Sequence, residues 1–206
     1  HLFHVVRKVC TKSGHVSTIP PVVKNNSHHG ISTIKSDYPK VPPRSILNIR
    51  QIAEHVREVV GDPKNAMGQI LEELLYSGTL DVVPNDDPRL ARGVEAVYIP
   101  EDKCIRLRDC DYEACILGTR TRSMFTFWHE FGHLILGHER SFSREESQEH
   151  KAYEDSEWQA NTFAGELLMP FAIIEAEGLI LPEELTERFG VSFEAARIRL
   201  KQLKRI

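Results

Sequence analysis

The chain has 206 residues, of which 41% are hydrophobic and 27% are charged. This balance excludes a disordered or collagen-like chain, and the length suffices for one ordinary domain with a small appendage. No apolar run approaches the roughly 18 residues that span a bilayer, and the net charge of −4 disfavours a protein that coats nucleic acid. The opening segment lacks the pattern of a secretory signal. We therefore expect a cytoplasmic protein that is not bound to a membrane.

The first forty residues differ in composition from the rest of the chain. Six Lys or Arg stand there against a single Asp, and half of the ten histidines lie in the same stretch. No helical period is sustained over it, and it ends in Val41-Pro42-Pro43. We predict that residues 1–44 form a basic, loosely structured extension. Its histidines lack the spacing of metal ligands.

From Ser45 onward the pattern is that of a globular domain. Apolar residues recur at helical steps up to Val60, and Pro63 is placed to open a second helix. The elements expected in chain order are helices at 46–60 and 63–75 and strands at 79–83, 94–99 and 104–108. The last two strands are expected to form a hairpin, residues 111–117 stay ambiguous, and 118–122 are expected to form a polar turn. The order of helices, small sheet and helices predicts an α+β fold.

The segment from 125 to 136 is apolar except for three polar residues, His129, Glu130 and His133, which form the pattern H-E-x-x-H. Residues four apart lie on one face of a helix, so the two imidazoles can bind one metal ion. Glu130 lies about 100° around the helix, where it can take a proton from water beside the metal without becoming a ligand. Burying these polar groups without a role would cost several kcal/mol. The pattern therefore predicts a metal site with Glu130 as general base.

A tetrahedral catalytic zinc takes three protein ligands and keeps one position open. The metzincin spacing is excluded, because Leu136 and Glu139 stand where that class has Gly and His. His138 follows His133 by five residues and points elsewhere on the helix. We expect it to support a ligand or to end the helix. The third ligand must then come from another helix.

That helix is predicted over residues 154–170. Glu157 and Asn161 lie four residues apart on one of its faces. The arrangement resembles that of gluzincins, in which a helical Glu binds the metal and a polar residue one turn later supports a ligand His. Glu154 and Asp155 are rival carboxylates, whose other role would be to stabilise the helix N-terminus. We favour Glu157 as the third ligand.

The two helical motifs together resemble those of the ImmA/IrrE family of metallopeptidases, over roughly residues 47–203. The likeness rests on the stretch from His129 to Leu134, on Glu157 with Ala160-Asn161, and on Leu167-Leu168-Met169-Pro170. It implies a mainly helical, zincin-like core with a small mixed or antiparallel sheet and a C-terminal helical pair. It further implies one Zn²⁺ per chain, held by His129, His133 and Glu157, with Glu130 as the base. Gln159 departs from the family, in which many members have Glu, and this change removes one rival ligand.

The resemblance also implies an activity. Members of the family are zinc-dependent endopeptidases that commonly cleave helix-turn-helix repressors of the Xre type and so derepress phage, mobile-element or stress genes. The alternative is a zinc fold that acts as a regulatory or toxin-like binding protein without turnover. Retention of Glu130 favours the enzyme, because a binding protein needs the ligands but not the base. The residue that stabilises the oxyanion stays open among Tyr98, Tyr112, Arg120 and His138.

Residues 179–206 are expected to form a helical pair, with helices at 182–188 and 193–203 and Ser192 as an N-cap. The layout is that of a DNA-binding helix-turn-helix, with basic residues on and beyond its last helix: Arg197, Arg199, Lys201, Lys204 and Arg205. We favour packing against the core, or docking of the repressor, over direct contact with DNA. The expected division is thus an extension at 1–44, a metallopeptidase domain at 45–178 and the helical pair at 179–206. The sequence does not fix the oligomeric state.

Overall fold

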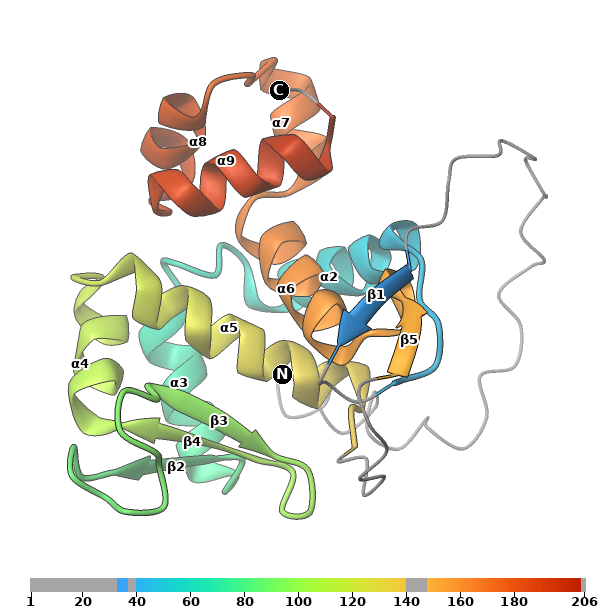
Figure 1. Ribbon diagram of the computed structural model, residues 1–206. Helices are drawn as coiled ribbons and strands as arrows, with labels where there is room; N and C mark the ends of the chain where they lie inside the picture. Colours follow the sequence, from blue (N-terminus) through green and yellow to red (C-terminus); the bar gives the residue numbers. More distant parts are fainter. Residues whose placement is uncertain (1–32, 37–39, 140–147, 205–206) are drawn as a thin grey trace.

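The computed structural model describes residues 33–36, 40–139 and 148–204. For residues 33–36 and 148–150 it describes the backbone only. The expected α+β class is confirmed, since helices dominate the fold and a small mixed sheet lies at one end of the molecule (Figure 1). Most of the predicted extension, with its five histidines, lies outside the described residues, as does Arg205. Among the helices in the described ranges, none has the length and apolar character needed to cross a bilayer.

The first two helices of the domain largely follow the predicted pattern. Helix α2 (Ile46–Val60) begins and ends where the sequence indicates. Helix α3 (Met67–Tyr76) begins later than predicted. The reason is that Asp62 Oδ1 accepts two backbone N–H groups of the following residues, each at 3.1 Å, and holds them in a turn. Pro63 therefore lies in this turn and does not open the helix.

Three strands form a sheet with the order β2-β4-β3. They are β2 (Leu80–Val83), β3 (Ala96–Ile99) and β4 (Cys104–Arg108). The predicted hairpin is confirmed, because β3 and β4 are antiparallel with Tyr98 opposite Ile105. Strand β2 runs parallel to β4 on its other side, so the sheet is mixed. Strand β3 is thus an edge strand, and it lies against helix α5 (Thr121–Leu136) (Figure 1).

Two central helices pack closely against each other. Before them, helix α4 (Asp109–Leu117) forms where the sequence was ambiguous, and the turn that leads from it to α5 is shorter than predicted.

Helix α5 packs along helix α6 (Ser156–Leu168) in the middle of the molecule (Figure 1). Gly132 permits this approach: a Cβ there would lie 3.0 Å from Phe163 Cδ1 and 3.3 Å from the backbone of Ala160. The absence of a side chain at Gly132 therefore lets the backbone of α6 come close to α5.

The C-terminal helices lie at the end of the molecule opposite the three-stranded sheet (Figure 1). They are α7 (Phe171–Glu177), which was not predicted, α8 (Pro182–Phe189) and α9 (Phe193–Gln202). Arg199 of α9 and Glu166 of α6 are both buried and share two bonds of 2.9 and 2.6 Å. Arg50 of α2 donates to the same carboxylate twice, at 3.1 Å. Arg199, one of the candidate DNA contacts, is therefore enclosed in the contact between α9 and the core.

Part of the predicted N-terminal extension pairs with the domain. Strand β1 (Thr33–Ser36) runs antiparallel to β5 (Gln148–Lys151). Residues 40–44 then lie along the chain just before α6, where Val41 N donates to the carbonyl of Glu154 at 2.8 Å. These bonds hold residues 40–44 against the start of α6. The domain boundaries at 44 and 178 remain predictions.

Candidate metal centre

Three side chains from helices α5 and α6 converge at one point: His129, His133 and Glu157. One ligand atom from each lies within 4.8 Å of the others, and no second group of this kind occurs in the described part of the chain. The two Nε2 atoms are 3.1 Å apart. Glu157 places Oε2 at 3.1 Å from His129 Nε2 and Oε1 at 3.2 Å from His133 Nε2. The structure thus brings the three predicted ligands together.

The charges in this cluster stabilise one another. Burial acts to raise the pKa of Glu157, but the hydrogen bonds with His129 and His133 outweigh it and hold the pKa well below its usual range. Burial acts to lower the pKa of His129, yet the hydrogen bond to Glu157 and the charge of Glu130 raise it overall. The result is an anionic carboxylate facing two imidazole nitrogens. Two nitrogen atoms and one oxygen are a donor set that catalytic zinc takes in proteins.

Glu130 lies beside the cluster and is held by the edge strand. The backbone N–H of Tyr98 donates to Glu130 Oε2 at 2.7 Å, while Oε1 lies 4.0 Å from His129 Nε2. One carboxylate oxygen is therefore fixed by β3, and the other faces the histidines. Burial raises the pKa of Glu130, because desolvation outweighs the attraction of His129 and His133. A carboxylate with a raised pKa at such a place is suited to proton transfer.

Each histidine of the cluster is also held through its second nitrogen. Asn161 Oδ1 lies 3.0 Å from His129 Nδ1, and His138 Nδ1 lies 2.9 Å from His133 Nδ1. Burial lowers the pKa of His138 to about 4, so this side chain is neutral at pH 7. Both Nε2 atoms are thereby turned toward Glu157. The expectation that Asn161 and His138 support the histidines is confirmed.

The rival carboxylates do not join the cluster. Glu154 Oε2 accepts the backbone N–H of Lys151 at 3.2 Å. Asp155 accepts the backbone N–H of Trp158 at 2.7 Å and forms the N-cap of α6. For both carboxylates the sequence allowed an alternative role at the N-terminus of this helix, and the structure shows that role for Asp155.

The role of Gln159 was missed by the sequence interpretation, which treated it only as the place of a lost ligand. Its side chain is fully buried, and its Oε1 lies 3.1 Å from His138 Nε2. The two residues are 21 positions apart on different elements, so no spacing rule connects them. The sequence offered little signal, because Gln159 stands in a segment that also holds the polar residues Asn161 and Thr162.

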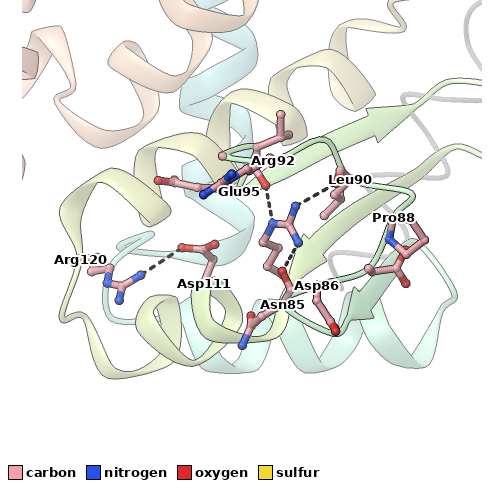
Figure 2. Close-up of a pocket in the computed structure, with 12 residues that line it drawn as sticks. Asn85, Asp86, Pro88, Leu90, Arg92, Glu95, Asp111 and Arg120 are labelled. Atoms are coloured by element: carbon pink, nitrogen blue, oxygen red, sulfur yellow. Dashed lines mark hydrogen bonds and ion pairs between the residues drawn. The ribbon is translucent and has the colours of Figure 1, made fainter.

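The four candidates for oxyanion stabilisation separate into two groups. The ring of Tyr98 stacks on that of His133 with centroids 6.4 Å apart, and His138 lies behind the same histidine. Tyr112 instead packs against the hydrophobic core. Arg120 lines a separate hollow of about 500 Å³ beneath the loop 85–95, where it pairs with Asp111 at 3.7 Å (Figure 2). This place is about 13 Å along α5 from His129.

Comparison with known proteins finds one family model that matches part of the chain. Residues 118–201, which include both helices of the cluster, match the IrrE N-terminal-like domain. The chain is also similar to a solved structure described as a Mycobacterium tuberculosis transcriptional regulator, at 22% identity and a TM-score of 0.42. That alignment covers 73% of this chain and 54% of the regulator, so the chain spans about half of that protein's length. No curated protein matches the chain. The match of residues 118–201 thus agrees with the resemblance of this segment to the ImmA/IrrE family of metallopeptidases.

Proposed function

We propose that the chain is a zinc-dependent endopeptidase in which His129, His133 and Glu157 hold one Zn²⁺ and Glu130 is the general base. The observation that carries the proposal is the convergence of two Nε2 atoms with the Glu157 carboxylate at 3.1 and 3.2 Å. A second carboxylate, that of Glu130, is held beside them by the edge strand. The match of residues 118–201 to the IrrE N-terminal-like domain supports the same assignment.

The chain's own residues then divide the chemistry between them. Zinc bound at the cluster would supply a Lewis acid that polarises a peptide carbonyl and lowers the pKa of water. Glu130 accepts the proton of the attacking water at Oε1, while the Tyr98 N–H keeps Oε2 in place. The same carboxyl group then donates that proton to the leaving amine. Because burial raises the pKa of Glu130, its protonated form is easier to reach between the two steps.

The proposed substrate is a helix-turn-helix repressor of the Xre type, cut so that the genes it controls are derepressed. The resemblance to the ImmA/IrrE family supports this substrate class, and the proposal places both proteins in the cytoplasm of a bacterium. Contact with the repressor, and not with DNA, is the proposed role of the exposed surface of α8 and α9. The burial of Arg199 is consistent with this preference.

The experiment compares three zinc-loaded chains: the wild type, Glu130→Gln, and Glu72→Gln as a matched change at an exposed carboxylate on α3. Each chain is incubated with a panel of purified Xre-type repressors and with bacterial cell extract. New protein N-termini are then identified by mass spectrometry, and bound zinc is measured in parallel. Glutamine retains the oxygen that accepts the Tyr98 N–H, so the substitution removes the base without removing this contact.

We expect Glu130→Gln to retain zinc and to cleave about 10²–10⁴-fold more slowly than the wild type. Glu72→Gln should cleave like the wild type. Equal cleavage by wild type and Glu130→Gln would remove Glu130 from the reaction. If a repressor is bound and inactivated by both chains but cut by neither, the chain is a zinc-fold binding protein and the peptidase proposal is wrong.

A further inference from the structure

A series of buried hydrogen bonds leads from His133 to the backbone of the N-terminal segment. His133, His138 and Gln159 expose only 9%, 5% and 0% of their surfaces. The series runs from His133 Nδ1 to His138 Nδ1 at 2.9 Å and from His138 Nε2 to Gln159 Oε1 at 3.1 Å. The amide nitrogen of Gln159 then donates to the carbonyls of Pro42 at 2.9 Å and Tyr153 at 2.8 Å. Both ring nitrogens of His138 and both polar side-chain atoms of Gln159 therefore take part in these hydrogen bonds.

The two carbonyls at the end of the series determine its direction. A carbonyl oxygen only accepts, so the Gln159 atom between Pro42 and Tyr153 is the nitrogen, and its oxygen faces His138. The opposite amide orientation would place three oxygens together and lose both donated bonds. The direction of the series is therefore fixed by backbone groups and not by the metal.

The proton positions follow from this direction. Gln159 Oε1 accepts, so His138 Nε2 carries the proton and donates. A neutral imidazole has a proton on one nitrogen only, so His138 Nδ1 accepts from His133 Nδ1. Because His133 Nδ1 carries a proton, Nε2, which lies 3.2 Å from Glu157, is the nitrogen of this ring that can bind a metal ion. The tautomer that a metal ligand needs is thus already selected.

We propose that His138 and Gln159 are positioning residues, which fix the tautomer and the ring orientation of His133 for metal binding. The inference rests on the metal centre proposed above. It also links a ligand on α5 to residues 40–44, because Pro42 is one of the two terminal acceptors. His129 has a shorter support, a single contact with Asn161 on the neighbouring helix.

The first test is a zinc titration against a chromophoric chelator with three substitutions of His138. In His138→Asn, the amide oxygen can occupy the place of Nδ1 and accept from His133. In His138→Gln, the amide reaches only the place of Nε2, and His138→Leu offers no polar atom. His55→Asn, at an exposed histidine on α2, is the control for the substitution itself.

We expect zinc affinity to fall about 10–100-fold in His138→Leu and His138→Gln. His138→Asn should restore binding close to that of the wild type, and His55→Asn should leave it unchanged. Equal losses in all three His138 variants would mean that His138 only fills space, and would overturn the proposal. A wild type that binds no zinc would contradict the proposed metal centre itself.

The second test needs neither zinc nor substitution. In the full chain stripped of metal and labelled with ¹⁵N-histidine, NMR reports which ring nitrogen carries the proton. We expect the proton on Nδ1 of His133 and on Nε2 of His138. A proton on Nδ1 of His138 would overturn the inference, whatever the chain does with zinc.

Discussion

Gly132→Ala tests whether the close approach of α5 to α6 is what assembles the metal centre. The added methyl group would lie 3.0 Å from Phe163 Cδ1 and 3.3 Å from the Cα and carbonyl oxygen of Ala160. The Phe163 ring is fully buried, and a backbone yields less easily than the end of a flexible side chain. The two helices must therefore move apart by a few tenths of an ångström.

The size of the effect follows from two opposing contributions. Replacing Gly by Ala within a helix stabilises it by up to about 1 kcal/mol, whereas overpacking a core costs about 1–3 kcal/mol. We expect Gly132→Ala to lower the free energy of unfolding by about 1–2 kcal/mol. Because Ala160 lies between Glu157 and Asn161, the displacement also pulls these side chains from the histidines. Zinc–ligand distances vary by only tenths of an ångström, so zinc binding should weaken.

The assay is urea unfolding of the zinc-free chains followed by zinc titration, with Gly165→Ala as the matched control. Gly165 is on α6, and a methyl group added there would meet Arg199 Cδ and Gln202 Oε1 at 3.9 Å, an ordinary contact distance. This variant should be as stable as the wild type or more stable, with unchanged zinc affinity. If Gly132→Ala behaves like Gly165→Ala in both measurements, the close approach does not assemble the centre.

Buried groups elsewhere give three more expectations. Arg199→Met removes one of the two guanidinium groups that pair with the buried Glu166 carboxylate. Urea unfolding should show a loss of stability of about 3 kcal/mol. A loss below about 1 kcal/mol is typical of an ion pair on the surface and would contradict the burial of this pair. Burial raises the pKa of Cys115 to about 12, which keeps its thiol protonated at pH 8. Iodoacetamide should therefore label it more slowly than the half-buried Cys110, and equal rates in the native chain would contradict its burial. Arg108 donates to carbonyls of the loop 85–94 (Figure 2), so Arg108→Met should speed amide hydrogen exchange there, and unchanged exchange would refute this anchoring.

The candidate ligands could be predicted because their chemistry is local in the sequence. His129 and His133 stand one helical turn apart, and Glu157 and Asn161 repeat that spacing on a second helix. What brings the helices together is also visible, since Gly132 is the residue without a side chain between the histidines. The pairing of the hairpin strands followed in the same way from two short apolar runs joined by a turn.

Features that depend on contacts between distant segments could not be predicted. The bond between His138 and Gln159 and the donation from the Tyr98 N–H to Glu130 exist only once the fold has formed. The buried and the exposed basic residues of α9 could not be told apart for a similar reason. Arg199 is indistinguishable in sequence from its exposed neighbours, and only Glu166, 33 residues earlier, shows that it is buried.

In the proposed metal centre, three side chains on two helices hold one metal ion. The most direct test is the zinc content of the purified chain by elemental analysis, in the wild type, in Glu157→Gln and in Glu154→Gln. We predict about one zinc per wild-type chain, a clear loss in Glu157→Gln, and no loss in Glu154→Gln, whose carboxylate is bonded to the backbone at Lys151. Zinc bound equally well by Glu157→Gln and the wild type would contradict the proposed metal centre.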